Sequence, residues 1–223
     1  MSHLIKADEG EIYDIELSED LLKKNEKIAM ENKKLLNAHG IKTIDVMGSI
    51  GTGKTSIIGQ LVQRLKDKYR IAAIAGDLTT TIDADLIARH GVEVVQINTG
   101  KECHLDANLV RKALKKIGLS KIDLLFIENV GNLICPAEFP LGSDKRVVVI
   151  SLTEGPNIVV KHPFVFMEAD LVVINKMDLA DVLGMDVDRL ERQINDINPK
   201  ASVVRMSCKN GMGIIGVIKA LGL

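Results

Sequence analysis

The chain has 223 residues, of which 46% are hydrophobic and 3% aromatic, and its formal net charge is -1. This length and apolar content predict a globular protein whose core is mainly aliphatic. The charge offers no basic surplus for binding nucleic acid or an anionic membrane, and no stretch approaches the roughly 20 apolar residues that span a bilayer. Three cysteines, an odd number, and an N-terminus without a signal-peptide core favour the cytoplasm.

The first 40 residues are predicted to form an N-terminal helical extension. Ser18 is a candidate N-cap and Gly40 a candidate stop. Between them an apolar stripe at roughly helical spacing contains Leu21, Leu22, Ile28, Leu35 and Leu36. The stripe is narrow, so it suits packing either on the chain's own domain or on a partner chain.

Residues 41–223 are predicted to form one P-loop domain of the α/β class. Strand-like apolar runs cover residues 41–47, 71–75, 92–97, 124–128, 147–151, 171–175 and 203–206. Helical segments are expected after the first run as far as residue 66, and over about 104–116 and 187–197. Repeated strand–helix units predict a mainly parallel sheet with helices on both faces and its active site at the carboxyl ends of the strands.

A glycine-rich segment follows the first predicted strand. Residues 48–55 read GSIGTGKT, which matches G-x-x-x-x-G-K-[ST] at a strand-to-helix junction. Backbone N–H groups can surround phosphate oxygens there, Lys54 can reach the β- and γ-phosphates, and the Thr55 hydroxyl can bind Mg²⁺. The predicted phosphate-binding residues are Gly48, Ser49, Gly51, Thr52, Gly53, Lys54, Thr55 and Ser56.

The strand 171–175 ends in Asn175-Lys176-Met177-Asp178, an arrangement that selects guanine. A carboxylate at Asp178 can accept hydrogen bonds from N1–H and the 2-amino group of guanine, whereas adenine has no donor at either place. After the next strand, Ser207, Cys208 and Lys209 fit a loop whose backbone approaches guanine O6. Cys208 is interpreted as a small residue of the base pocket. The predicted ligand is therefore GTP.

Two further carboxylates are candidates for catalysis. Glu128 ends an apolar strand and is followed by Asn-Val-Gly, so it can hold the Mg²⁺ shell or orient the attacking water, while Gly131 offers its N–H to the γ-phosphate. Asp77 follows another strand and is a second Mg²⁺ candidate; alternatively, it caps the next helix. Lys54, Glu128 and Asp77 form the predicted catalytic set.

These motifs together resemble HypB, a family of hydrogenase nickel-incorporation GTPases. The resemblance covers about residues 20–220 and rests on segments 48–55, 76–77, 98–101, 103–107, 128–137, 153–155 and 175–178. It implies a GTPase that forms a homodimer, favoured by GTP, and assists Ni²⁺ insertion. The implied partners are a nickel-delivery accessory protein and the hydrogenase large-subunit precursor. Unlike some members, this N-terminus has no cysteine and carries only His3 and His39.

The resemblance also implies a metal site formed by Cys103, His104 and Cys135. Thiolate and imidazole ligands suit Zn²⁺ and Ni²⁺ alike. Three ligands leave a tetrahedral shell open, so either water or the second chain of a dimer would complete it. The hypothesis is that GTP favours the dimer and remodels this site, because Cys135 lies on the loop expected to sense the γ-phosphate. His90 and His162 are expected to be structural.

Other functions remain compatible with these motifs. The chain could be a regulatory GTPase with a structural zinc, a urease-type nickel accessory GTPase, or a small-molecule kinase. Lys145, Arg146 and Lys161 are candidates for a charge supplied across a dimer, although no motif supports them.

Overall fold

The computed structural model describes the backbone of residues 15–223 and the side chains from residue 19 onward. Residues 1–14 of the predicted N-terminal extension, including His3, lie outside the described part. Within it, no helix is both long and apolar enough to cross a membrane.

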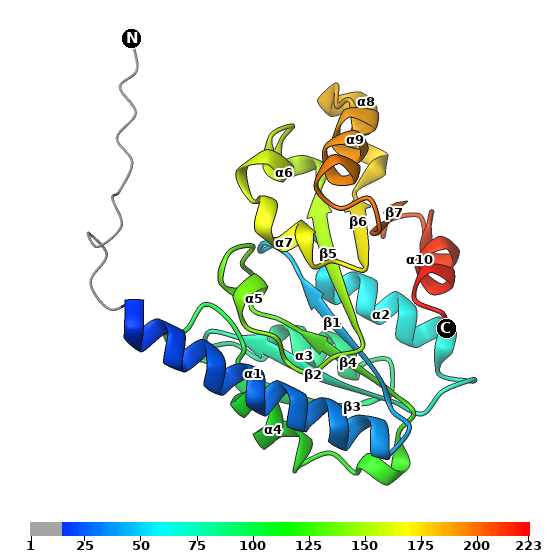
Figure 1. The fold of residues 1–223 in the computed structure, drawn as a ribbon. Helices are drawn as coiled ribbons and strands as arrows, with labels where there is room; N and C mark the ends of the chain where they lie inside the picture. The colour runs from blue at the N-terminus through cyan, green and yellow to red at the C-terminus, as the bar shows by residue number, and fades with distance from the viewer. Residues whose placement is uncertain (1–14) are drawn as a thin grey trace.

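A seven-stranded parallel sheet forms the centre of the molecule (Figure 1). Its strands run in the order β3-β2-β4-β1-β5-β6-β7. They are β1 Lys42–Met47, β2 Ile71–Asp77, β3 Glu93–Asn98, β4 Leu124–Glu128, β5 Lys145–Ser151, β6 Leu171–Asn175 and β7 Ser202–Arg205. All the predicted strands are present, and no predicted end is displaced by more than two residues. The predicted parallel α/β fold is confirmed.

Helices cover both faces of the sheet. They are α1 Ile15–Ala38, α2 Lys54–Leu65, α3 Ile82–Ala88, α4 Ala107–Leu114, α5 Cys135–Glu138, α6 Ile158–Lys161, α7 Pro163–Met167, α8 Ala180–Leu183, α9 Val187–Ile197 and α10 Ile214–Ala220. The core of one face is shared by α2, α3 and α10. On the other face, α1 and α4 cover one half of the sheet, and α6, α7 and α9 cover the other half. Successive strand residues point to opposite faces, so both faces bury aliphatic side chains.

The helix α1 packs on its own chain, alongside α4 (Figure 1). Its buried face consists of Asn25, Ile28, Ala29, Asn32 and Leu36. Of the predicted apolar stripe, Ile28 and Leu36 belong to this face, whereas Leu21 and Leu35 are exposed. Ser18 lies inside the helix, so it is not the N-cap. Two polar residues, Asn25 and Asn32, are buried on the face that the apolar pattern predicted to be aliphatic.

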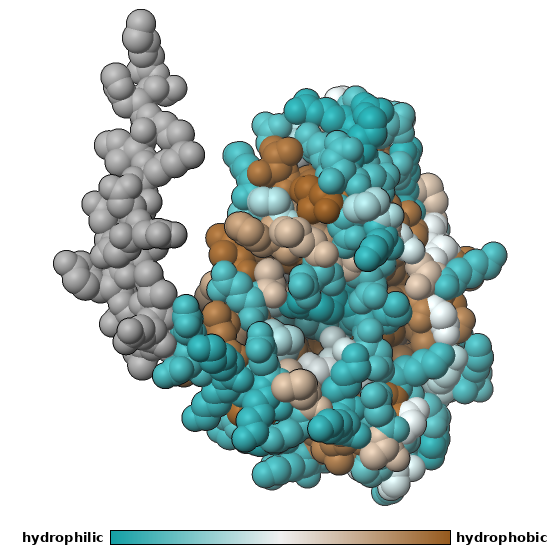
Figure 2. Space-filling view, in the orientation of Figure 1, coloured by the Kyte–Doolittle hydropathy of each residue, from teal (hydrophilic) through white to brown (hydrophobic). Residues whose placement is uncertain are grey.

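The core prediction concerns Phe126, in the central strand β4. Its side chain is 0% exposed, whereas that of Phe164 on α7 is 73% exposed. Figure 2 shows that hydrophilic residues cover most of one face of the molecule, with hydrophobic residues gathered in smaller patches. We expect Phe126→Ala to lower the free energy of unfolding by about 3–5 kcal/mol, because it leaves a cavity. The matched change Phe164→Ala should cost less than about 0.5 kcal/mol. Urea unfolding measures both, and equal losses would contradict the assignment of the core.

Candidate nucleotide and metal site

The phosphate loop lies between β1 and α2, at the carboxyl edge of the sheet. Gly53 has a φ of 101°, a left-handed conformation that favours glycine. A Cβ there would also lie 2.3 Å from Asn175 Nδ2. Asn175 occupies this place because its Nδ2 donates to the Thr52 carbonyl at 2.7 Å. The phosphate loop is therefore tied to the end of β6, where the predicted base-binding residues begin.

Lys54 lies over the phosphate loop in a buried position. Its Nζ is 3.1 Å from the carbonyl oxygens of both Gly48 and Ser49. Burial lowers the pKa of Lys54, and the negative charges of Glu128 and Asp83 partly oppose that effect. The ammonium group is held beside the loop, where phosphate oxygens would take over its hydrogen bonds.

Three oxygen-bearing side chains meet beside Lys54. The Thr55 hydroxyl oxygen is 2.7 Å from Glu128 Oε1 and 2.9 Å from Asp83 Oδ1. Glu128 Oε2 is buried and has no hydrogen-bond partner among the described residues. Burial raises the pKa of Glu128 to about 7. A buried carboxylate oxygen without a partner, next to a hydroxyl and a second carboxylate, is a donor set that fits Mg²⁺.

Asp77 lines the same cleft but has other hydrogen bonds. Its Oδ1 accepts from the backbone N–H groups of Thr79 and Thr80 at 2.9 and 2.8 Å. Burial pushes its pKa upward, yet these N–H groups hold it below the ordinary value. The N-cap of α3 is Thr81, so Asp77 closes the turn before that helix and does not cap it. Asp83, which no sequence motif singled out, is the carboxylate in contact with Thr55.

The base-binding candidates converge from the ends of β6 and β7. Asp178 Oδ1 accepts from the Ser207 hydroxyl at 2.5 Å, and this bond is the main reason why the pKa of Asp178 is lowered. The backbone N–H of Cys208 donates to Asn175 Oδ1 at 3.2 Å. Lys176 has a φ of 63°, and its Nζ reaches the Thr153 hydroxyl. The Asp178 carboxylate is thus held in place by its neighbours.

A single cleft of ≈ 550 Å³ joins the phosphate, Mg²⁺ and base candidates. It is lined by Gly51, Gly53, Lys54, Thr55, Ser56, Asp77, Asp83, Glu128, Gly131, Asn175, Lys176, Asp178, Cys208 and Lys209, among others. Four predicted residues, Gly48, Ser49, Thr52 and Ser207, lie outside this lining and bond to residues within it. The volume is within the range of small-molecule sites.

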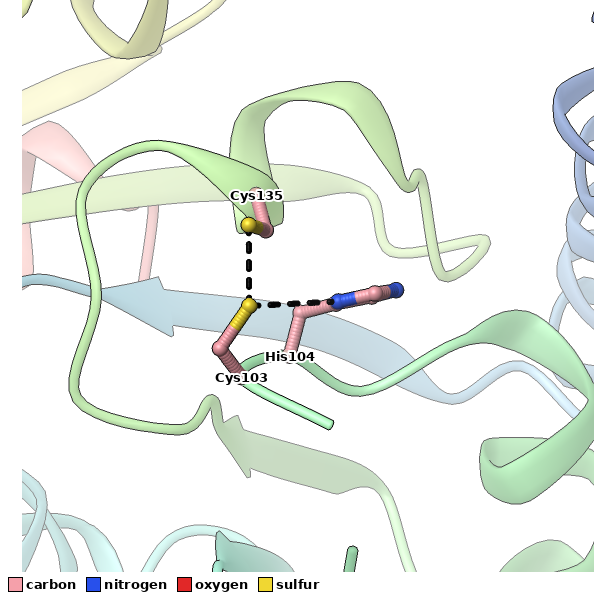
Figure 3. A group of neighbouring side chains, drawn as sticks. All are labelled: Cys103, His104 and Cys135. Carbon is pink, nitrogen blue, oxygen red and sulfur yellow. Dashed lines mark hydrogen bonds between the residues drawn. The ribbon is translucent and has the colours of Figure 1, made fainter. Parts of the chain in front are cut away.

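Cys103, His104 and Cys135, hereafter the metal group, come together at the same edge of the sheet (Figure 3). One ligand atom from each lies within 4.8 Å of the others. The two sulfur atoms are 2.9 Å apart, and Cys103 Sγ is 4.0 Å from His104 Nδ1. Cys103 and His104 follow β3, whereas Cys135 begins α5 after β4. Soft thiolate and imidazole donors in this number fit Zn²⁺ or Ni²⁺.

The surroundings of the metal group set its protonation. Burial lowers the pKa of His104, although Glu102 and Asp106 oppose the shift, and this favours the neutral ring that can bind metal. Burial and the neighbouring Cys103 raise the pKa of Cys135. The His104 ring also stacks on Phe139, with centroids 3.9 Å apart. Phe139 therefore limits the orientations that His104 can adopt.

Backbone and side-chain contacts connect the metal group to the nucleotide cleft. Asn129 follows Glu128, and its Oδ1 accepts from the backbone N–H of Leu105 at 3.0 Å. Gly48 of the phosphate loop forms an antiparallel bridge with Asn132, and Asn132 Nδ2 donates to the Cys103 carbonyl at 3.4 Å. Asn129 lines the cleft and contacts the segment that carries Cys103 directly, whereas the phosphate loop reaches that segment through Asn132.

The remaining candidates lie elsewhere. Lys145 pairs with Asp170, and Arg146 donates to the Pro136 and Ala137 carbonyls. These two residues and Lys161 lie outside the cleft lining. His90 packs on Gly59, and His162 precedes α7. Neither histidine joins the metal group.

Over residues 42–205 the sequence matches the family described as CobW/HypB/UreG, nucleotide-binding domain. It is 53% identical over 205 residues to the probable hydrogenase maturation factor HypB of Methanocaldococcus jannaschii, an alignment that covers 92% of this chain and 93% of that protein. The chain belongs to the HypB family. The resemblance inferred from the motifs is confirmed.

Two solved HypB structures share the fold. HypB from Archaeoglobus fulgidus is 42% identical with a TM-score of 0.84, and the match covers 90% of this chain and 98% of that one. HypB from Helicobacter pylori in complex with nickel is 35% identical with a TM-score of 0.84, covering 89% and 93%. The P-loop architecture of this chain is therefore that of the HypB family.

The raised pKa of Glu128 predicts a pH dependence of stability. The folded protein keeps this proton up to about pH 7, whereas an unfolded glutamate, with its ordinary pKa of 4.5, loses it at lower pH. The folded state thus binds more protons between these values, and its stability falls as pH rises through them. Glu128→Gln removes that loss, so the variant should gain on the parent by up to about 1.4 kcal/mol per pH unit.

Urea unfolding of the metal-free, nucleotide-free protein at pH 5 and pH 7.5 measures this gain. Asp45, whose pKa burial raises to about 6, is unchanged in both proteins and cancels in the comparison. A constant difference between Glu128→Gln and its parent at the two pH values would contradict the shift.

Proposed function

We propose that this protein binds GTP with Mg²⁺, hydrolyses it to GDP and phosphate, and uses the nucleotide to control a nickel ion held by the metal group. Nickel would be cargo for a [NiFe]-hydrogenase large-subunit precursor. The observation that carries this proposal is a pair of hydrogen bonds from the loop after β4. Asn129, which lines the nucleotide cleft, accepts from the backbone N–H of Leu105 next to His104, and Asn132 donates to the backbone carbonyl of Cys103. Family membership supports the same role, since relatives at 53% and 40% identity are named a probable hydrogenase maturation factor and a hydrogenase maturation factor.

The cleft has the parts needed to bind and hydrolyse a guanine nucleotide. N–H groups of the phosphate loop and Lys54 would hold the phosphates. Thr55, Glu128 and Asp83 would hold Mg²⁺, which when bound neutralises charge that develops on phosphate oxygens. Glu128 Oε1, which contacts the Thr55 hydroxyl, would face Mg²⁺, and Oε2, which has no partner among the described residues, would accept a hydrogen bond from a water molecule beside the γ-phosphate. Orienting that water is the step we assign to Glu128.

The loop after β4 can carry the nucleotide state to the metal group. Gly131 lies against the phosphate loop, since a Cβ there would be 2.3 Å from Ile50 Cγ1. Contact of Gly131 with a γ-phosphate would therefore move residues 129–132 relative to the phosphate loop. Asn129 and Asn132 would pass this movement to residues 103–105, and the chain itself continues to Cys135. GTP and GDP should then favour different metal geometries.

The metal group suits a transferable ion better than a structural one. Structural zinc sites usually have four protein ligands, whereas this group supplies three, and both of its cysteines are partly exposed. An open position allows a ligand from a second copy or from a nickel-delivery accessory protein to enter. We propose that GTP favours a homodimer in which two metal groups face each other. The same ligands accept Zn²⁺, which would compete with Ni²⁺.

Asp178→Asn tests the base assignment. The change removes two hydrogen bonds from guanine to a carboxylate, so GDP affinity should fall at least about 100-fold. Xanthosine diphosphate should bind the variant more tightly than the parent, because its C2 carbonyl can accept from the new amide. Competition against a fluorescent guanine nucleotide measures both affinities. Unchanged GDP affinity would show that Asp178 does not contact the base.

Nickel titration in three nucleotide states tests the coupling. We expect the affinity or stoichiometry of Ni²⁺ to differ between the nucleotide-free, GDP and non-hydrolysable GTP-analogue forms, with the GTP form richest in dimer. Calorimetry and mass measured in solution report both quantities. Cys135→Ser is the control and should remove the nucleotide-dependent site. Identical nickel binding and mass in all three states would contradict the proposed function.

A further inference from the structure

The buried face of α1 carries two polar side chains that point toward the domain. Asn25 is 6% exposed and Asn32 is 1% exposed. They are seven residues apart, which places them two turns apart on the same face of the helix. Buried amides must find hydrogen-bond partners inside the protein. The partners of these two amides are backbone groups in the two segments that carry the metal group.

Both asparagines hold the same residue, Ala107. Asn25 Oδ1 accepts from the Ala107 N–H at 2.8 Å, and Asn32 Nδ2 donates to the Ala107 carbonyl at 2.8 Å. Ala107 is three residues beyond His104 and begins α4. The segment 103–107 is therefore fixed to α1 through both backbone groups of one residue.

The same two side chains also hold the segment that follows Cys135. Asn25 Nδ2 donates to the Pro140 carbonyl at 2.9 Å, and Asn32 Nδ2 donates to the Leu141 carbonyl at 3.2 Å. Gly142, with a φ of 95°, comes so close that a Cβ would lie 2.4 Å from the Ala29 carbonyl oxygen. The residue that follows segment 135–141 thus lies against the backbone of α1.

Each asparagine of α1 therefore hydrogen-bonds to both segment 103–107 and segment 135–141. The sulfur atoms of Cys103 and Cys135, one in each segment, are 2.9 Å apart, although the two cysteines are 32 positions apart in the sequence. Phe139, next to Pro140, stacks on His104 in the same assembly. Asn32 Oδ1 is buried without a partner among the described residues, so this arrangement costs some stability. Leucines on that face would cover the core equally well but would not link the two segments.

We propose that α1 is a clamp for the metal group, with Asn25 and Asn32 as positioning residues that fix segment 103–107 relative to segment 135–141. This inference rests on the proposed metal site. The asparagines touch no ligand side chain; they act through the backbone next to it. Groups that hydrogen-bond directly to metal ligands typically contribute about 10- to 100-fold to metal affinity, and we take this range as the scale for a contact that acts through the backbone.

The test is Asn25→Leu in the full chain. The substitution keeps the size of the side chain roughly constant and removes one bond to each segment. We expect nickel affinity, measured in competition with a chelator, to fall about 10- to 100-fold. The thiolate-to-nickel absorption band should shift or weaken as well. GDP affinity should not change, because none of the described side chains of α1, residues 19–38, lines the nucleotide cleft.

Asn198→Leu is the matched control. Asn198 is also buried and donates to the carbonyls of Phe166, Met167 and Ala169, away from the metal group. This change should lower the unfolding free energy and leave nickel affinity unaltered. Asn25→Asp, which keeps the acceptor for the Ala107 N–H and loses the donor to Pro140, should give an intermediate nickel affinity even if Asn25→Leu folds poorly.

The outcomes separate the clamp from the proposed function. If the parent binds nickel through its thiols and Asn25→Leu and Asn25→Asp bind it equally well, the clamp is wrong and the proposed function stands. An equal loss of nickel affinity in Asn198→Leu would show a general effect of stability, which also overturns the clamp. If the parent itself holds no nickel at Cys103 and Cys135, both proposals fail.

Discussion

The buried amide of Asn129 is the contact through which the two sites of this protein meet. Its oxygen accepts both from Leu105, next to His104, and from Val130, in the loop that follows Glu128. Separating these partners would leave buried polar groups unpaired, at a cost of about 1–3 kcal/mol each. In the proposed function, a nucleotide that moves the loop after β4 would therefore also move the segment beside the metal group. The carboxyl edge of one parallel sheet carries both candidate sites, so the proposed coupling would need no distant relay.

The metal group is held from two directions. On the nucleotide side, Asn129 and Asn132 contact the segment that carries Cys103. On the opposite side, Asn25 and Asn32 of α1 fix the far ends of both metal segments. The first connection runs through the loop that the proposed function has the γ-phosphate displace, whereas the second runs through the long helix α1. We infer that α1 provides a fixed reference against which the nucleotide-dependent loop moves the ligands.

Much of the fold and part of the site could be predicted from local sequence. Buried parallel strands are continuous apolar runs, so 124–128 and 171–175 were predicted to the residue, and the phosphate loop has its own glycine pattern. Helices α5, α6, α7, α8 and α10 were missed, because four to seven residues contain too few turns for periodicity, and α3 was expected only as a helix after Asp77, without bounds. Asp83 follows no motif and meets Thr55 only through the packing of α3 on α2. The burial of Asn25 and Asn32 could not be predicted, because asparagines in a charged helix are usually exposed and the backbone groups that pair with these two are more than 70 positions away in the sequence.

Hydrogen exchange of the backbone amides in segment 103–107 tests the connection between the sites most directly. The metal-free protein would be compared in complex with GDP and with a non-hydrolysable GTP analogue, so that bound metal cannot cause any difference. The account predicts that the Leu105 amide changes its exchange rate together with residues 129–132, since Asn129 accepts its hydrogen bond. A response confined to the phosphate loop and residues 128–132, with segment 103–107 exchanging identically in both complexes, would contradict it.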